Sequence, residues 1–265
     1  MSKFGVTTWL AIAAASVVFI IWPRPRCTYA VGMVWLVYLP IFACGVILIQ
    51  MNYFTRAICR GTPGRNVVAL TFDDGPNPAA TPELLDLLKR EGISATFFCI
   101  GKDVAQHPEI TARIAAEGHL VANHSFTHPW YISMLWGEKL NRELAQTQDA
   151  IESATGVRPT YFRPPSGTTG PHFPAALKQL GLTLVGWDVR SLDTVTPPRK
   201  AIERILRLAT DGSIIVLHDG GGASGHVVEI VSAAVKELRA RGFSFERLDR
   251  LVGHTELLEN APPAN

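Results

Sequence analysis

The chain has 265 residues, a length that allows one large domain or two small ones. Its charge is nearly balanced, with 25 Lys+Arg against 23 Asp+Glu and no basic run, which excludes the positively charged surface typical of nucleic-acid-binding proteins. The mean hydropathy is positive (+0.16), which is unusual for a soluble enzyme, and the N-terminal segments carry most of the excess.

Two apolar segments open the chain. Val6–Trp22 and Tyr29–Tyr53 contain no charged residue; the second is long enough to cross a bilayer, and the first is at the short end of the range. A polar break with two prolines and two arginines separates them, so residues 1–55 are predicted to form a two-helix transmembrane hairpin. A cleaved signal peptide is the alternative for the first segment, but no small-x-small site follows Trp22 and a second apolar segment comes directly after it.

The arginines that flank the hairpin bear on its orientation. Two spans put both ends of the hairpin on the same side of the membrane. Three arginines between residues 56 and 65 lie on that side together with Lys3, against two arginines in the break. By the positive-inside rule, this small excess of positive charge favours a cytoplasmic location for the residues after the hairpin, in a two-pass membrane protein.

After a linker expected at 56–66, which contains Gly61, Pro63 and Gly64, β-branched runs alternate with amphipathic patterns. The predicted strands are Val67–Asp73, Ala95–Ile100, Leu120–Asn123, Tyr161–Arg163, Leu182–Asp188, Ser213–His218 and Phe243–Arg247. The predicted helices are Pro82–Glu91, Val104–Glu117, Gly137–Thr155, Pro171–Leu180, Pro198–Thr210 and His226–Arg241. This alternation predicts an α/β fold with a parallel sheet, either a barrel or a doubly wound sheet.

Polar motifs fall at or just beyond the ends of several predicted strands. They contain Asp73, Asp74, His124, Arg163, Asp193 and His218. In parallel α/β folds the carboxyl ends of the strands meet at one edge and carry the chemistry. The sequence therefore predicts one active site built from all of these motifs.

Three of the residues suit a divalent metal. His124 and His128 are four residues apart, a spacing at which a helical turn or a loop brings both rings to one side. Together with Asp74 they form a His/His/Asp set typical of zinc, with positions left for water and substrate. Iron, cobalt or nickel would also suit these ligands, since affinity alone does not select the metal. The four cysteines include no Cys-x-x-Cys pair, so neither a cysteine-based zinc site nor a disulfide framework is indicated.

The adjacent carboxylates Asp73 and Asp74 are expected to have different roles. Neighbouring residues of a strand point to opposite faces, so one carboxylate would bind the metal and the other would accept a proton from water. By itself the run Asp74-Gly75-Pro76-Asn77 is typical of a turn. The preceding apolar strand and the two histidines favour the catalytic interpretation.

Three further charged residues could complete the site. His218 ends the apolar run Ile214–Leu217 and could protonate a leaving amine. Arg163, in a proline-rich loop, could orient a carboxylate and keep it ionised. Asp193 could either complete that pair or support His218.

The motifs Thr71-Phe72-Asp73-Asp74-Gly75, His124-Ser125-Phe126-Thr127-His128, Arg163-Pro164-Pro165 and Leu217-His218 occur in this order along the chain. In this combination the sequence resembles the polysaccharide deacetylases of carbohydrate esterase family 4, the NodB-homology domain. The resemblance covers about Val67 to Leu251. It indicates a deacetylase domain at 67–252, followed by a C-terminal tail at 253–265.

The resemblance implies a fold and a set of roles. The fold would be a distorted (β/α)7 barrel. Asp73 would be the general base, oriented by Arg163, and His218 the general acid. The implied metal ligands are Asp74, His124 and His128. Asp193 would be the acidic residue of the fourth motif, and the substrate contacts would come from Pro164, Pro165, Ser166 and Leu217.

Two departures from the family pattern bear on the substrate. An aromatic residue usually follows the prolines of the third motif, where this chain has Ser166. The fourth motif usually reads Asp-x-x-Asp-Trp, where this chain has Arg190-Ser191-Leu192-Asp193-Thr194. Because these aromatic residues are replaced, the sequence does not determine which sugar and which acyl group the site accepts.

The resemblance implies hydrolysis of N-acetyl groups on the amino sugars of a glycan such as peptidoglycan or chitooligosaccharide. The hairpin also suits a deacylase or deformylase that meets a lipid-linked amino sugar at the bilayer. An inactive sugar-binding membrane protein is the alternative of a different class. The family resemblance favours an extracytoplasmic domain, in contrast to the arginine count. The expected partners are a glycan or glycolipid and the lipid bilayer, with no nucleic acid.

Overall fold

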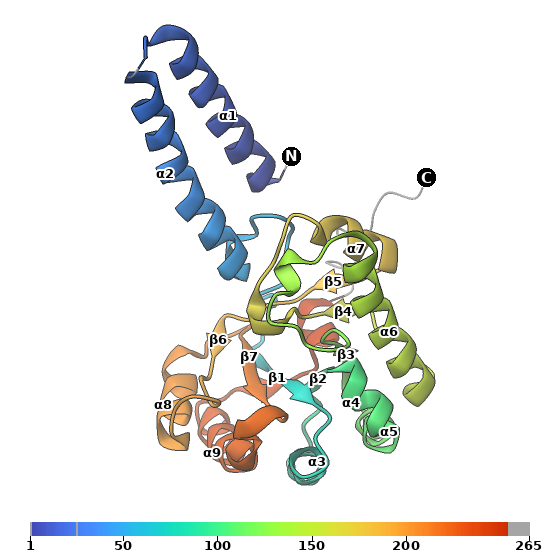
Figure 1. Ribbon diagram of the computed structural model, residues 1–265. Coiled ribbons are helices and arrows are strands. Elements are labelled where there is room, and N and C mark those ends of the chain that lie inside the picture. The colour runs from blue at the N-terminus through green and yellow to red at the C-terminus, as the bar shows by residue number, and fades with distance from the viewer. Residues whose placement is uncertain (1, 25, 254–265) are drawn as a thin grey trace.

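A helical hairpin precedes an α/β domain in the described part of the chain. The structure, a computed structural model, describes residues 2–24 and 26–253, so most of the expected C-terminal tail lies outside the described residues. Helices α1 (Lys3–Ile21) and α2 (Arg26–Ile47) pack side by side and project away from the domain (Figure 1). Both are long and apolar enough to cross a membrane, and only 6% of each apolar window is buried.

The domain is built on a parallel sheet. Its strands are β1 (Val67–Gly75), β2 (Thr96–Cys99), β3 (Leu120–Asn123), β4 (Tyr161–Phe162), β5 (Thr183–Leu184), β6 (Val189–Arg190), β7 (Ile214–His218) and β8 (Ser244–Phe245). The strand order is β5-β4-β3-β2-β1-β7-β6, and β8 pairs with the beginning of β1. The pairings between these strands are parallel, which confirms the predicted α/β class as a half-barrel. The expected strand Leu182–Asp188 is wrong in its extent, because only β5 pairs there and β6 follows as a separate strand.

Helices cover the outer face of this half-barrel (Figure 1). They are α3 (Ala80–Arg90), α4 (Gly101–Gln106), α5 (Pro108–Ala116), α6 (Gly137–Thr155), α7 (Phe173–Leu180), α8 (Pro198–Leu208) and α9 (Val227–Ala240). The single helix predicted over Val104–Glu117 is two helices, because Pro108 has no N–H to continue the hydrogen-bond ladder and begins a new helix at its first position. Short 3₁₀ turns occur at Ile49–Met51 (η1), Ile132–Met134 (η2), Pro165–Gly167 (η3) and Gly221–His226 (η4).

The central strand β1 separates two layers of core. Val68, Leu70 and Phe72 pack in the layer between the sheet and the helices. The alternate positions face the interior of the half-barrel, where Val67 and Ala69 are buried. The same alternation directs Asp73, at the carboxyl end of the strand, toward the interior.

The chain between the hairpin and β1 is packed against the domain. Helix α2 ends at Ile47, before the end of the apolar segment predicted to span the membrane, and Asn52 then adopts a left-handed conformation and accepts a hydrogen bond from the Ala57 N–H (2.7 Å). In the segment expected as a linker, Ile58 pairs with Val185, beside β5, and Arg60 pairs with Ser213, beside β7. These bridges attach the segment to the domain beside the edge strand β5 and beside β7.

Candidate active site

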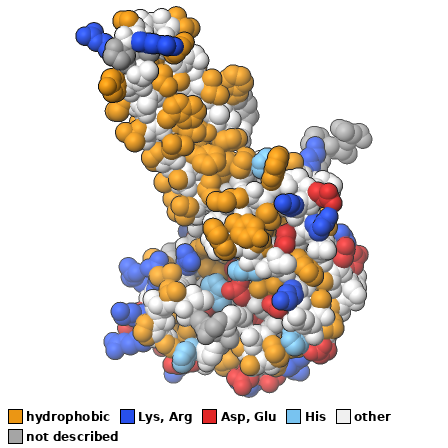
Figure 2. Space-filling model, viewed as in Figure 1, with side chains coloured by type: hydrophobic (Ala, Val, Ile, Leu, Met, Phe, Trp, Pro, Cys, Tyr) orange, Lys and Arg blue, Asp and Glu red, His pale blue; other side chains and the backbone are white. Residues whose placement is uncertain are grey.

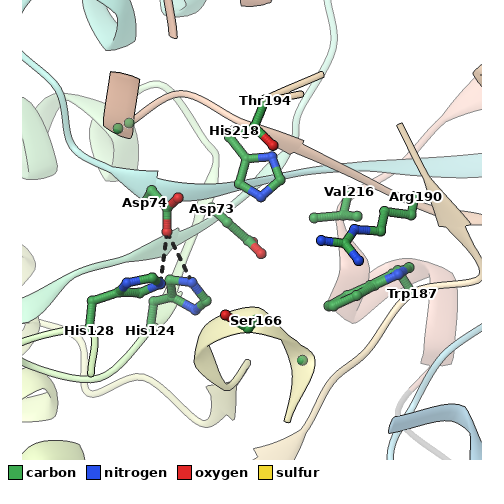
Figure 3. Close-up of a pocket in the computed structure, with 13 residues that line it drawn as sticks. Asp73, Asp74, His124, His128, Ser166, Trp187, Arg190, Thr194, Val216 and His218 are labelled. Carbon is green, nitrogen blue, oxygen red and sulfur yellow. Dashed lines mark ion pairs between the residues drawn. The ribbon is translucent and has the colours of Figure 1, made fainter. Parts of the chain in front are cut away.

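A polar pocket lies at the carboxyl ends of the central strands. Its lining residues come from β1, β6, β7 and the loops that follow β3, β4, β5, β6 and β7 (Figure 3). The lining residues are Asp73, Asp74, His124, His128, Ser166, Gly167, Trp187, Arg190, Thr194, Val216, His218, Gly220 and Gly221. The pocket therefore brings together motifs that are up to about 150 positions apart in the sequence, as parallel strands in one sheet require.

Both carboxylates of the Asp-Asp pair line this pocket, contrary to the expectation that they point to opposite faces. The register of β1 against β2 shifts between Asp73 and Gly75. Asp74 lies at this bulge with φ 70°, a left-handed conformation that turns its side chain toward the same pocket as Asp73. Gly75 is required next to the bulge, because a Cβ there would lie 2.4 Å from Asp219 Oδ2.

Asp74, His124 and His128 form a compact group of potential metal ligands. Asp74 Oδ1 lies 3.3 Å from His124 Nε2 and 3.1 Å from His128 Nε2, and the ligand atoms of the group lie within 4.8 Å of one another. Burial acts to raise the pKa of Asp74, but hydrogen bonds and charge interactions with the two histidines lower it below its usual range. One carboxylate and two imidazoles in this arrangement fit a divalent metal such as zinc.

The second nitrogen of His124 is also used. Its Nδ1 lies 2.7 Å from the backbone carbonyl oxygen of Arg163. A donated hydrogen bond here fixes the tautomer in which Nε2 has a lone pair directed at the group of ligands, as is usual for histidines that bind metal. The side chain is almost fully buried, so the ring orientation is well constrained.

The two histidines are held by a loop and not by a helical turn. Ser125 and His128 both have positive φ, at 63° and 53°. Glu143 on α6 accepts hydrogen bonds from the N–H groups of Phe126 (3.0 Å) and Thr127 (2.8 Å), and also from the Thr127 hydroxyl (2.8 Å). Sequence reasoning missed Glu143, because its relation to the histidine loop depends on how α6 packs.

Asp73 is paired with a buried arginine. Arg163 Nη1 donates to Asp73 Oδ1 (2.7 Å) and to Thr71 Oγ1 (2.8 Å), and its Nη2 donates to the carbonyl oxygen of Gly186 (2.9 Å). The guanidinium also lies 4.0 Å from the centre of the Phe98 ring. Arg163 is fully buried behind the pocket, so it can fix Asp73 without contacting a bound molecule.

His218 is paired with Asp193, which decides between the two partners considered for that carboxylate. His218 Nδ1 lies 2.9 Å from Asp193 Oδ1, and the His218 backbone N–H donates to Asp193 Oδ2 (2.8 Å). Burial acts to lower the pKa of His218, but the Asp193 hydrogen bond and the carboxylates of Asp73, Asp193 and Asp74 raise it to about 9. The imidazole is therefore charged at neutral pH and has a proton to give.

The expected substrate contacts are only partly found in the lining of the pocket. Ser166 lines it, whereas Pro164 and Pro165 are buried and hold the turn on which Ser166 lies with φ 57°. Leu217 is an incorrect prediction, because its side chain packs in the helix-covered core. Val216, on the opposite face of β7, lines the pocket instead.

The pocket also contains residues that the sequence did not single out as contacts. Trp187, Arg190 and Thr194 line the side away from the two histidines (Figure 3). The position of Arg190 could have been expected from its place in the fourth motif and from the alternation of side chains along a strand. Trp187 lies between β5 and β6, where no local sequence pattern predicts which way its side chain points.

Comparisons with known proteins agree with the geometry. The polysaccharide deacetylase family model matches residues 60–185. The chain is 35% identical over 200 residues to a chitooligosaccharide deacetylase of Rhizobium leguminosarum bv. trifolii, covering 71% of this chain and 92% of the relative. It is 36% identical over 190 residues to the peptidoglycan-N-acetylmuramic acid deacetylase PdaC of Bacillus subtilis, covering 71% of this chain.

The fold is also similar to that of a solved structure. The Bc1960 peptidoglycan N-acetylglucosamine deacetylase matches with a TM-score of 0.69 and 29% identity, covering 74% of this chain and 92% of that one. The chain spans only 39% of the length of PdaC, so the similarity to that relative concerns one part of a longer protein.

Proposed function

The chain belongs to the polysaccharide deacetylase family, and we propose that it is a metal-dependent hydrolase that removes N-acetyl groups from the amino sugars of a glycan. The observation that carries the proposal is the arrangement of the pocket. A paired base, Asp73 with Arg163, and a paired acid, His218 with Asp193, adjoin one group of metal ligands. Peptidoglycan and chitooligosaccharide are the expected substrates, since relatives at 30% identity or more are named for them.

We assign the metal to Asp74, His124 and His128, with zinc as the expected ion and cobalt, nickel or iron as alternatives. When bound, the metal supplies a Lewis acid for the amide oxygen and lowers the pKa of water. The buried, hydrogen-bonded ring of His124 supports this assignment, because such a ring is already in the tautomer that a ligand needs.

Asp73 acts as the general base in this proposal. Its Oδ1 is held by Arg163, and the carboxylate points into the pocket between His218 and Ser166 (Figure 3). It accepts a proton from the water that attacks the carbonyl carbon of the N-acetyl group. The guanidinium of Arg163 fixes the orientation of the Asp73 carboxylate for this step.

His218 acts as the general acid. As the carbon–nitrogen bond breaks, its Nε2 donates a proton to the sugar nitrogen, and acetate and a free amine are the products. Asp193 holds the Nδ1 side of the ring and stabilises the imidazolium before the transfer. Ser166 and Val216, which line the pocket, are proposed to contact the acyl group and the sugar.

The proposal is tested with the purified full-length chain in detergent, loaded with zinc. Acetate release is measured from peptidoglycan and from chitooligosaccharides. Wild-type protein should release acetate from at least one of them, and chelation of the metal should abolish the release. A metal-loaded protein that binds the glycan but releases no acetate would instead support an inactive sugar-binding protein.

A lipid-linked amino sugar is the second candidate substrate, and the position of the hairpin favours it. The backbone N–H of Thr169, in the loop after Ser166, donates to the Val46 carbonyl oxygen at the end of α2 (2.9 Å). The loop that follows His128 presents large apolar side chains to solvent, namely Trp130, Tyr131, Met134 and Trp136. Trp136 lies 6.0 Å from the ring of His172, which follows the loop joined to α2.

Hydrophobic side chains therefore continue from the hairpin onto the adjoining face of the domain (Figure 2). Aromatic rings of this kind prefer the interface of a bilayer. If the hairpin spans the membrane, the pocket lies near the membrane surface, where a lipid-linked sugar is met. Release of acetate or formate from lipid-linked sugar extracts, but not from soluble glycans, would favour this candidate.

We propose that residues 1–55 remain attached as a two-pass membrane hairpin and are not cleaved as a signal peptide. Three contacts support this. Lys3 Nζ donates to the Met51 carbonyl oxygen (2.7 Å), the Phe4 N–H donates to the Tyr53 carbonyl oxygen (3.0 Å), and the Thr7 and Tyr53 hydroxyls lie 2.6 Å apart. Mass spectrometry of the protein isolated from membranes should find residues 3–21 still present, and a reporter fused at the C-terminus would give the side of the domain.

A further inference from the structure

The pocket contains a guanidinium that none of the proposed roles uses. Arg190 ends β6, where it pairs in register with Val216 of β7. Its neighbour Val189 is buried in the helix-covered core, so the alternation along the strand directs Arg190 to the pocket side, as it does Val216. Figure 3 shows the guanidinium on the side of the pocket opposite His124 and His128, with Asp73 and Ser166 between them.

The side chain of Arg190 is exposed, with the ring of Trp187 beneath its guanidinium, and hydrogen bonds hold the backbone of both residues. The Arg190 Cζ lies 5.9 Å from the ring centre of Trp187, which is only 9% exposed. The Trp187 carbonyl oxygen accepts a hydrogen bond from Gln50 Nε2 (3.0 Å), and the Arg190 carbonyl oxygen accepts one from Arg204 Nε (2.7 Å). An aromatic face beneath a guanidinium limits the directions in which it can donate.

The charge of Arg190 has no counter-ion among the residues that the structure describes, and its guanidinium donates no hydrogen bond to them. The nearest carboxylates along the chain are already engaged. Asp188 accepts hydrogen bonds from Ser213 Oγ (2.8 Å) and the Ile214 N–H (2.7 Å). Asp193 is paired with His218. The donors of Arg190 are thus available to a molecule in the pocket.

We propose that Arg190 is a specificity residue that binds an acidic substituent of the sugar, a carboxylate or a phosphate, while the N-acyl group lies at the metal ligands. This inference rests on the proposed function. A guanidinium fits either anion through two parallel N–H···O bonds, which also fix the orientation of the sugar. A carboxylate would be an acidic ether substituent on the ring, and a phosphate would be the link of the sugar to a lipid or another carrier.

The test compares three substrates with the metal-loaded full-length chain. They are a neutral N-acetylglucosamine oligomer, a glycan strand containing N-acetylmuramic acid, and N-acetylglucosamine 1-phosphate. Arg190→Gln should lower kcat/KM for an acidic substrate by about 10- to 100-fold, the value of a charge-assisted hydrogen bond, mainly through a higher KM. The neutral oligomer should change less than about twofold, since it has no group for Arg190 to bind.

Two further variants control for charge and for folding. Arg190→Lys should recover part of the loss, because lysine keeps the charge without the paired donors. Arg199→Gln removes an exposed arginine of α8 that pairs with Glu203 outside the pocket, and it should leave all substrates unchanged.

A loss of kcat/KM on the N-acetylmuramic acid strand indicates that Arg190 binds a carboxylate, and a loss on N-acetylglucosamine 1-phosphate indicates that it binds a phosphate. Equal losses on neutral and acidic substrates, or no loss on any, would overturn the inference and leave the proposed function standing. Absence of acetate release from every substrate by the metal-loaded wild-type chain would overturn the proposed function instead.

Discussion

Replacing Asp193 by asparagine should shift the pH dependence of the reaction. Asp193 Oδ1 lies 2.9 Å from His218 Nδ1, and Oδ2 accepts the His218 backbone N–H (2.8 Å). Asparagine has nearly the same shape and keeps one acceptor oxygen, so the main change is the loss of the negative charge. That charge is one of the causes that raise the pKa of His218 to about 9.

The size of the shift follows from the interaction that is lost. A hydrogen bond to a charged group contributes about 1.5–3 kcal/mol, and about 1.4 kcal/mol corresponds to one pKa unit. Asp193→Asn should therefore lower the pKa of His218 by roughly one to two units. The general acid must be protonated, so a lower pKa means that the acid form is lost at a lower pH. The alkaline limb of the pH–rate profile should move down by the same amount.

The assay is kcat/KM for acetate release, measured from neutral to alkaline pH for the wild type and for Asp193→Asn. Ser191→Ala is the matched control, because Ser191 Oγ donates to Asp193 Oδ1 (2.6 Å) but carries no charge. The control should move the limb much less. An alkaline limb that stays at the same pH in Asp193→Asn would refute the assignment of His218 as the acid supported by Asp193.

Two other predictions follow from the supports of the site. Glu143→Ala removes the acceptor that holds the loop between the two histidines and should weaken metal binding by about 10- to 100-fold. Competition with a metal indicator measures the affinity for the metal. Equal affinity in Glu143→Ala and in the exposed control Glu138→Ala would contradict this role of Glu143. Arg163→Met leaves Asp73 buried without its charge partner and should lower the free energy of unfolding by about 3–5 kcal/mol. Denaturant unfolding in detergent measures this free energy. Unchanged stability would show that the Arg163–Asp73 pair does not stabilise the fold.

The fold class could be predicted because its signals are local. The apolar run at the start of β1 is buried on both faces, as the central strand of a parallel sheet must be. The break between α4 and α5 was also present in the sequence, since Pro108 cannot donate a backbone hydrogen bond. It was missed because the apolar pattern of a helix continues on both sides of it.

The details of the pocket depend on contacts between distant segments. The bulge that turns Asp74 into the pocket forms only when β1 pairs with β2, so strand alternation alone gave the wrong direction. Val216 lines the pocket in place of the predicted Leu217 for a similar reason. The pairing of β7 with β1 determines which side chains of β7 face the pocket. The departures of the fourth motif were visible in the sequence, but the availability of Arg190 follows from the partners of the carboxylates around it.

The most direct test of the account measures metal content and acetate release together in three proteins: the wild type, Asp73→Asn and His124→Ala. The wild type should bind about one zinc ion and release acetate from an N-acetylated glycan. Asp73→Asn should keep the metal and lose turnover, and His124→Ala should lose both. Full activity in either variant, or full metal content in His124→Ala, would contradict the division of the site into a metal-binding triad and a separate base.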